Sequence, residues 1–336
     1  MKAGVYKGPE MIEFDNIDKP VISSGEALIK IKYAGFCGSD LFIYSGKHPR
    51  AKPPLVPGHE FSGIVEEIKG ESNIQPGDRV TVRPTYFCND CPACNEGFYH
   101  VCENLKLVGI DCDGGFGEYV AVSLDQIFKL PDKLDLKEAS LIEPLAVAVH
   151  SVRSSGLKVG DDAVILGSGP IGILLAIVAK RAGAKEVYIN DVNEFRLEIA
   201  RQFGFKAFNS KNVNPVSYIN GVTSEEGADV LFEAAGVEDT AKIMNKMTKI
   251  KGEIVVVSVF KEIPKADLLN LNFKEQSMIG TRVYTDKDFD TAIKIAPMIK
   301  NLGKIITDEL KLEEVEEGIR KIKRGDNCLK VVCKIE

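Results

Sequence analysis

The 336-residue sequence predicts an α/β protein with two domains, one rich in β-strands and one built on a doubly wound parallel sheet. Two different sequence patterns along the chain support this prediction. Up to about residue 135, short alternating runs such as ALIKIKYA (27–34) and DRVTVRP (78–84) are separated by glycine and proline, which is typical of a compact β region. From about residue 150 to 280, apolar strands alternate with amphipathic helices, as a parallel sheet requires.

The strand and helix signals of the second region follow one another closely. DAVILG (162–167) is a buried strand, and PIGILLAIVAKRAG (170–183) is a helix with a proline near its start and a glycine after its end. EVYIND (186–191) is the next strand, followed by a helix over 193–204. The series continues with the strands ADVLFEAAG and GEIVVVS, and the last stretch adds the helical segments DKDFDTAIKIAPMIKNLG and LEEVEEGIRKIKRG and the strand CLKVVCKI.

Composition excludes some partners. A formal net charge of −6 leaves no broad basic field, so nucleic acid is not an expected partner. The longest apolar stretches are far too short to span a membrane, and the first twenty residues hold no run resembling a signal peptide. We therefore expect a cytoplasmic protein, in which closely spaced cysteines indicate a metal site and not disulfides.

A glycine-rich turn predicts a dinucleotide site. GSGPIG fits the pattern G-x-G-x-x-G directly after an apolar strand and at the start of a helix, which is the context that the mechanism needs. Gly167 permits the turn, Gly169 lets the backbone approach a pyrophosphate, and Gly172 lets helix and strand pack closely. Pro170 and Ile171 complete the motif, and the helix N-terminus favours the phosphates.

A carboxylate at the end of the next strand predicts the identity of this dinucleotide. Asp191 can accept hydrogen bonds from the adenosine ribose hydroxyls, whereas a 2′-phosphate there would meet a like charge. NAD is therefore expected over NADP. Arg196 lies nearby in the sequence, and its positive charge can weaken the preference for NAD over NADP.

Four cysteines within fifteen positions predict a structural zinc site. They follow the spacing C-x2-C-x2-C-x7-C, at Cys88, Cys91, Cys94 and Cys102. Four thiolates complete the tetrahedral coordination of zinc and leave no position for substrate. The alternatives are an iron–sulfur cluster, whose common ending C-x3-C-P is absent, and a group of free thiols.

A second set of ligand types is scattered along the chain. Cys37 ends an alternating strand, His59 and Glu60 begin another, and Glu143 lies at the border of the two sequence patterns. Cysteine, histidine and carboxylate ligands with one open position are typical of catalytic zinc. Taken alone, a histidine is more often a satisfied core residue, and a glutamate beside it usually faces solvent.

Five motifs in one order resemble the zinc-dependent medium-chain dehydrogenases, in particular the branch of sorbitol, butanediol and threonine dehydrogenases. They are G-F-C-G-S-D (35–40), G-H-E-F-S-G (58–63), the four-cysteine lobe, E-P-L-A-V (143–147) and G-S-G-P-I-G. The likeness extends over essentially the whole chain.

The resemblance implies the domain arrangement. A GroES-like catalytic domain is expected from residues 1–148 and 284–336, with a structural zinc lobe at 86–104. A Rossmann domain that binds NAD is expected at 149–283, inserted between those two stretches. The resemblance also implies a homodimer or homotetramer and two zinc ions in each chain.

The resemblance further implies roles for individual residues. Cys37, His59 and Glu60 match zinc ligands, and Glu143 matches a fourth ligand or a partner of the zinc-bound water. Asp40 is expected to hold the His59 imidazole in the ligating tautomer. Ser39 is expected to take the substrate hydroxyl proton while hydride passes from a secondary alcohol to the nicotinamide.

Four cations depart from the family pattern. Arg83 stands where sorbitol- and butanediol-type relatives often carry an acidic residue, and His48, Arg50 and Arg282 are also unexpected. They are candidates to bind an anionic group of the substrate, such as a carboxylate, phosphate or sulfonate. The alternative is that they form ion pairs at the surface or between subunits.

Three functions fit these observations to different degrees. The first is an NAD- and zinc-dependent dehydrogenase that acts on a polyol, a vicinal diol or a 3-hydroxy amino acid. A non-catalytic NAD-binding protein has no need of a metal site with an open position. Metal-free reductases of the same fold lack both the cysteine lobe and the G-H-E ligands. The sequence does not single out the alcohol.

Overall fold

The computed structural model describes residues 1–336, which divide into two compact units. Unit 1 comprises Met1–Glu143 and Thr285–Glu336, and unit 2 comprises Pro144–Tyr284. The sequence placed the two changes of domain after residues 148 and 283. The first change comes earlier in the structure, inside the first turn of helix α4 (Ile142–Ser154). None of the helices combines the length and apolar character needed to span a bilayer.

Unit 1 is organised around a seven-stranded sheet in the order β16-β17-β3-β4-β5-β9, with β8 paired to β3. Its strands are β3 (Glu26–Gly35), β4 (Glu60–Lys69), β5 (Arg79–Val82), β8 (Tyr119–Ser123), β9 (Ile127–Lys129), β16 (Ile306–Lys311) and β17 (Lys330–Lys334). β17 lies antiparallel to β3, with Val332 opposite Gly35. This pairing makes the end of the chain part of the same core as its beginning.

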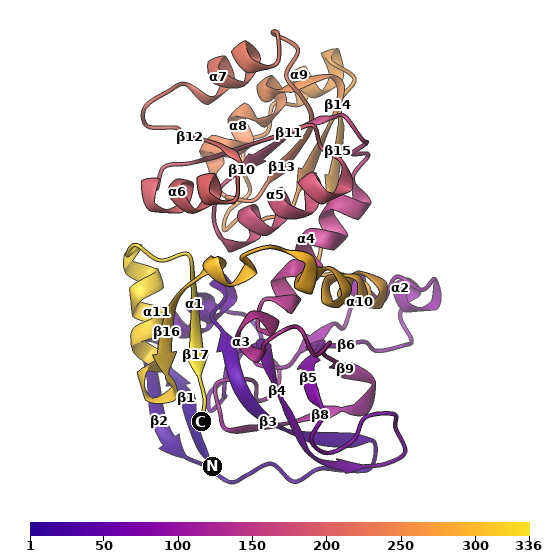
Figure 1. The fold of residues 1–336 in the computed structure, drawn as a ribbon, viewed down its shortest axis with the longest axis vertical. Helices are drawn as coiled ribbons and strands as arrows, with labels where there is room; N and C mark the ends of the chain where they lie inside the picture. The colour runs from indigo at the N-terminus through magenta and orange to yellow at the C-terminus, as the bar shows by residue number, and fades with distance from the viewer. The chain divides into compact units, whose positions relative to one another are not determined.

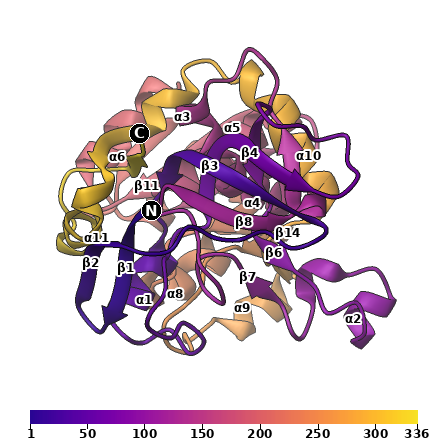
Figure 2. The same cartoon turned by 90° about the horizontal axis from the view of Figure 1, so that it is seen from below.

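Two small sheets and several short helices complete unit 1. The sheets pair β1 (Lys2–Gly8) with β2 (Met11–Asn16), and β6 (Thr85–Tyr86) with β7 (Lys106–Leu107). The helices are α1 (Gly38–Tyr44), α2 (Pro92–Asn95), α3 (Leu136–Ala139), α10 (Asp286–Ile295) and α11 (Val315–Arg324). Figure 2 shows α2 at the tip of a loop that projects away from the strands, and β2 beside α11.

Unit 2 is a six-stranded parallel sheet with helices on both faces (Figure 1). Its strands are β10 (Asp162–Leu166), β11 (Glu186–Asp191), β12 (Lys206–Asn209), β13 (Ala228–Glu233), β14 (Thr248–Val256) and β15 (Ser277–Gly280). Its helices are α5 (Pro170–Ala182), α6 (Glu194–Gln202), α7 (Pro215–Val222), α8 (Glu238–Met247) and α9 (Leu268–Phe273). The strand order β12-β11-β10-β13-β14-β15 reverses between β10 and β13, which is the arrangement of dinucleotide-binding sheets.

Most predicted elements of unit 2 form where their patterns indicate. Helix α5 begins at Pro170 and ends before Gly183, whose φ of +112° is the left-handed conformation that glycine adopts readily. The predicted helix after residue 285 was too long, since α10 ends at Ile295. Pro297 follows, and its ring and missing N–H are incompatible with a continuing helix.

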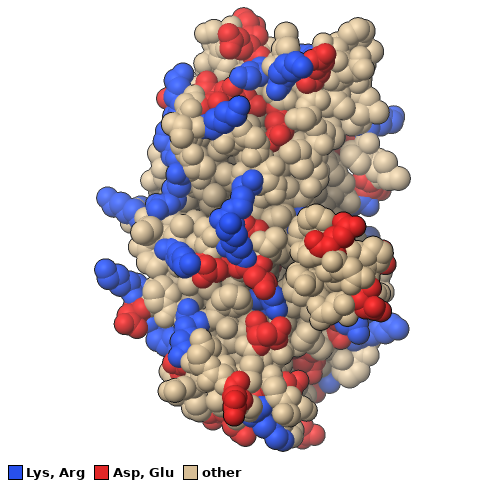
Figure 3. All heavy atoms as spheres, turned by 90° about the vertical axis from the view of Figure 1, so that its right-hand side faces the viewer, with Lys and Arg blue, Asp and Glu red and all other residues tan.

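The surface charges are mixed. On the face drawn in Figure 3, lysines and arginines are interspersed with aspartates and glutamates, with no extended field of either sign. This distribution agrees with the small net charge of the sequence.

Candidate functional sites

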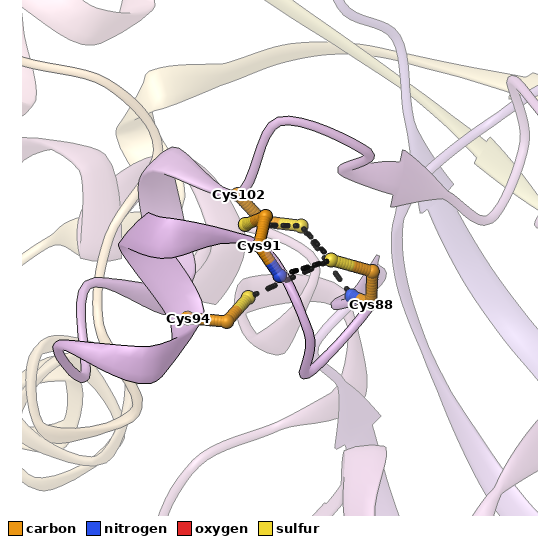
Figure 4. A group of neighbouring side chains, drawn as sticks. All are labelled: Cys88, Cys91, Cys94 and Cys102. Atoms are coloured by element: carbon orange, nitrogen blue, oxygen red, sulfur yellow. Dashed lines mark hydrogen bonds between the residues drawn. The ribbon is translucent and has the colours of Figure 1, made fainter.

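Four cysteine sulfurs converge in the projecting loop of unit 1 (Figure 4). Cys91 is the N-cap of α2 and Cys94 lies within this helix, whereas Cys88 and Cys102 come from the chain on either side. The Sγ–Sγ distances are 3.9 Å for Cys88 to Cys94, 3.9 Å for Cys91 to Cys102, and 3.4 Å for Cys102 to Cys88. None of the four forms a disulfide.

These sulfur positions fit a tetrahedral zinc ion, since thiolates bound at about 2.3 Å lie about 3.8 Å from one another. The backbone N–H groups of Asp90 and Cys91 lower the pKa of Cys88 to about 6, which favours the thiolate that the metal requires. Four thiolate ligands leave no open position, so an ion here shapes the loop and does not bind substrate.

A second cluster forms where β3 and β4 pair. β3 ends at Gly35, which lies opposite Glu60 at the start of β4. Cys37 follows as the N-cap of α1, and His59 immediately precedes Glu60. One ligand atom from each of Cys37, His59 and Glu60 lies within 4.8 Å of the other two. A cysteine, a histidine and a carboxylate are three ligands of the kind used in catalytic zinc sites.

The electrostatics of this cluster favour a cation. Burial disfavours the charged form of His59, but the negative charges of Cys37, Asp40 and Glu143 outweigh it and raise the pKa of His59 well above its ordinary value. His59 is 5% exposed and Glu60 is 2% exposed. The site therefore concentrates buried negative charge, which a bound metal ion can compensate.

Asp40 is buried beside this cluster, in the first turn of α1. Its Oδ2 accepts a hydrogen bond of 2.7 Å from the backbone N–H of Cys37, within the capping box of α1. Asp40 Oδ1 and His59 Nδ1 are both buried without a hydrogen-bond partner. Asp40 therefore holds the Cys37 backbone through Oδ2, and its charge acts on His59; that it orients the His59 imidazole stays a prediction.

Sequence reasoning missed Lys330. This residue begins β17, is 3% exposed, forms an ion pair with Glu60 and donates a hydrogen bond of 2.8 Å to the Phe36 carbonyl. Burial lowers the pKa of Lys330, but the nearby negative charges, that of Glu60 foremost, outweigh this effect and raise the pKa above its ordinary value. A Cβ on Gly35 would lie 2.6 Å from Glu60 Oε2, so the glycine makes room for this pair. A lysine inside the apolar run CLKVVC was the signal that could have revealed it.

Ser39 and Glu143 lie at the edge of this cluster. Ser39 is in the first turn of α1, and its buried Oγ has no hydrogen-bond partner. Glu143 is 7% exposed, and its charge acts on both His59 and Lys330. The structure thus brings three of the four predicted ligands together and places the fourth within electrostatic range.

In unit 2 the glycine motif forms the turn between β10 and α5. Gly167 has a φ of +99°, and a Cβ on Gly172 would lie 1.9 Å from the Gly167 carbonyl oxygen, so neither position tolerates a side chain. Gly169 faces open space at the N-terminus of α5, and Pro170 and Ile171 form the first turn of that helix. The free N–H groups there suit a phosphate.

Asp191 ends β11 beside this turn. Its Oδ2 accepts a hydrogen bond of 2.8 Å from the Ser168 N–H, and its Oδ1 accepts from Val192 and Asn193. A carboxylate has about four acceptor positions, so Oδ2 retains capacity for a ribose hydroxyl. Arg196 in α6 has a buried Nε without a partner.

Two of the four unexpected cations are engaged within unit 1. Arg83 is 3% exposed and pairs with Asp286 and, at 3.3 Å, with Asp125. Arg50 lies 3.4 Å from Asp111. An anionic group approaching either arginine would meet these carboxylates, so the contacts favour the alternative of ion pairs that join distant segments.

The other two cations differ in their surroundings. His48 Nδ1 accepts hydrogen bonds from the N–H groups of Arg50 and Ala51 at 3.3 and 3.2 Å, which stabilise its own loop. Arg282 is exposed and lies just after the end of β15, next to Thr281. Of the four, Arg282 is the cation whose charge is most accessible to a ligand.

Comparison with known proteins adds independent findings. Residues 23–132 match the family model of the alcohol dehydrogenase GroES-like domain, and residues 170–297 match that of the zinc-binding dehydrogenases. A 2-dehydro-3-deoxy-L-galactonate 5-dehydrogenase from Pseudoalteromonas atlantica is 42% identical over 274 residues, which cover 81% of this chain and 80% of that protein.

Solved structures agree. The crystal structure of 2R,3R-butanediol dehydrogenase from Bacillus subtilis has a TM-score of 0.92 and 31% identity, with 99% of each chain covered. A provisionally named zinc-binding dehydrogenase from Sinorhizobium meliloti, bound to NADP, has a TM-score of 0.93 and 31% identity, with 99% of this chain and 98% of that chain covered.

Zinc content tests the two clusters separately. We expect about two zinc ions per chain, falling to about one in His59→Ala and to about one in Cys102→Ser, because each variant removes a ligand from a different site. Only Cys102→Ser should lower the melting temperature markedly, since a closed site contributes folding energy. Metal analysis with circular dichroism measures both, and an unchanged zinc content in His59→Ala would contradict the second site.

Proposed function

Since the chain belongs to the zinc-dependent medium-chain dehydrogenases, we propose that it oxidises a secondary alcohol to a ketone and passes the hydride to a nicotinamide cofactor. The observation that carries this proposal is the cluster of Cys37, His59 and Glu60, which exists in addition to the closed cysteine site. A protein that only binds a dinucleotide has no use for three converging ligands with a coordination position to spare.

Each residue of the cluster would have its own role in the oxidation. Cys37, His59 and Glu60 would hold a zinc ion, with Glu143 as a further acceptor, and zinc supplies Lewis acidity that lowers the pKa of a substrate hydroxyl. Ser39 has a buried Oγ with no other partner, which suits it to accept a hydrogen bond from the substrate hydroxyl and to pass its own proton toward solvent as the hydroxyl proton leaves. Lys330 pairs with Glu60 and restrains its carboxylate.

NAD is the proposed cofactor, although a relative binds NADP. The support is Asp191, whose carboxylate lies beside the glycine turn and would repel a 2′-phosphate.

An Asp191→Ser variant tests the cofactor choice. We expect the ratio of kcat/KM for NAD to that for NADP to fall by at least about tenfold, because the like charge that opposes the 2′-phosphate is gone. Steady-state kinetics with both cofactors measures the ratio, and Asp239→Ser on the surface of α8 is the matched control. A native enzyme that prefers NADP would contradict the proposal outright.

Two substrate classes remain within this proposal. The butanediol dehydrogenase likeness supports a neutral diol or polyol. The sugar-acid name of the 42% identical relative supports an anionic hydroxy compound, and Arg282 is the exposed cation best able to recognise it.

Paired substrates separate the two classes. If the substrate is anionic, kcat/KM for a hydroxy acid should exceed that for its neutral polyol counterpart, and Arg282→Gln should lower only the former, by about ten- to a hundredfold. Arg181→Gln on α5 serves as the control for a general loss of charge. Equal kcat/KM for both members of the pair in the native enzyme would exclude the anionic class.

A homodimer or homotetramer in the cytoplasm completes the proposal. None of the eight cysteines forms a disulfide, which fits a reducing compartment. β15 is an edge strand of the unit 2 sheet, and the preceding helix α9 exposes Leu268, Leu269 and Phe273, a combination that favours association through this edge.

Solution mass tests the proposed interface. Light scattering should give a multiple of the 36.8 kDa chain mass, and Leu269→Asp combined with Phe273→Asp should shift the protein toward smaller species, because charges would be placed in an apolar contact. Val21→Asp, at a 90% exposed position of unit 1, is the control. A monomeric native protein would contradict the proposal.

A further inference from the structure

A buried carboxylate outside the sites described above lies at the carboxyl edge of the unit 2 sheet. Glu233 is the last residue of β13, and its side chain is 0% exposed. It forms no ion pair. Buried carboxylates without a cation are costly, so one that persists needs several hydrogen-bond donors to hold it.

Glu233 has those donors from three places. Its Oε1 accepts hydrogen bonds from the N–H groups of Ala235 and Gly236, at 3.0 and 2.9 Å, and from the Thr240 hydroxyl at 2.7 Å. Its Oε2 accepts from the Ser258 hydroxyl, which follows β14. One carboxylate thus ties together the chain segments that leave β13 and β14.

The segment held by Glu233 also borders the glycine turn. A Cβ on Gly167 would lie 3.1 Å from the Cα, Cβ and N atoms of Ala235, so the two backbones are in close contact. The carboxyl ends of β10, β13 and β14 are therefore connected through Glu233 and the residues that it fixes. In open parallel sheets this edge is where the dinucleotide binds.

The strand order indicates which half of the sheet would bind which half of the cofactor. Each half of such a sheet binds one mononucleotide, and Asp191 on β11 marks β10–β12 as the half for adenosine. The β13–β15 half then receives the nicotinamide mononucleotide. Glu233 lies at the end of the first strand of that half.

We propose that Glu233 is a positioning residue that shapes the nicotinamide half of the cofactor site and that its buried charge favours NAD⁺ over NADH. The inference rests on the proposed nicotinamide dependence. The ring of NAD⁺ is positively charged and that of NADH is neutral, so a nearby buried anion attracts the oxidised form selectively. The donors around Glu233 are all neutral, so its negative charge is not cancelled locally.

Glu233→Gln tests the charge while preserving the shape. The glutamine oxygen can accept from Ala235, Gly236 and Thr240, and its NH₂ can donate to Ser258, whose hydroxyl is also an acceptor. Affinities for NAD⁺, NADH and ADP-ribose are measured by calorimetry on the intact zinc-loaded protein. We expect the NAD⁺ affinity to fall about tenfold, that for NADH to change less than about threefold, and that for ADP-ribose to stay constant, because ADP-ribose lacks the ring.

Ser258→Ala is the second variant. It keeps the charge of Glu233 but removes one donor that joins β14 to it, so it should weaken NAD⁺ and NADH equally and leave the affinity for AMP unchanged, because AMP lacks the whole nicotinamide mononucleotide half. Ser155→Ala, which removes a hydroxyl from the segment after α4, is the matched control.

Four outcomes would overturn the inference. An equal loss of NAD⁺ and NADH affinity in Glu233→Gln would remove the charge effect. Unchanged NAD⁺ affinity in both variants would remove any role for Glu233, and a parallel loss of ADP-ribose binding and melting temperature would show a merely structural residue. A native protein that binds no ADP-ribose would instead refute the proposed cofactor, and the inference with it.

Discussion

The antiparallel pairing of β3 with both β4 and β17 is the constraint on which the open metal site depends. The first pairing sets Gly35 opposite Glu60, and this register brings Cys37, two residues after Gly35, close to His59. The second brings Lys330 from the last strand to the same Glu60. A shift of either register by one residue would turn alternate side chains to the other face of the sheet and disperse the ligands.

The two metal clusters differ in how much of the fold each requires. The four cysteines lie within one loop, so their convergence needs only a short helix and a few turns. The other cluster draws on strands from both ends of unit 1 and includes a buried ion pair. A closed sulfur site can form locally and stabilise its loop, whereas an open site needs a rigid frame to keep three ligands from rearranging around the ion.

Unit 2 uses two carboxylates in comparable positions. Asp191 ends β11 and accepts three backbone hydrogen bonds, and Glu233 ends β13 and accepts two, together with two from hydroxyls. Both lie at the carboxyl edge of the sheet, on either side of β10. Each orders a loop without the help of a cation, which keeps a negative charge close to where a dinucleotide would lie.

The patterns that could be read directly from the chain are those whose members are close in sequence. The glycine turn, the strands around it, helix α5 with its ends and the four-cysteine spacing all depend on local geometry, and the structure contains each of them. The contacts that could not be foreseen join distant residues. Glu60 and Lys330 are separated by 270 positions, and Arg83 and Asp286 by 203. Periodicity and spacing describe which face of an element is apolar, but they do not say which polar groups will share a buried space. That depends on how strands pair and helices pack, because a buried charge is stabilised by whichever partner the assembled core brings within reach.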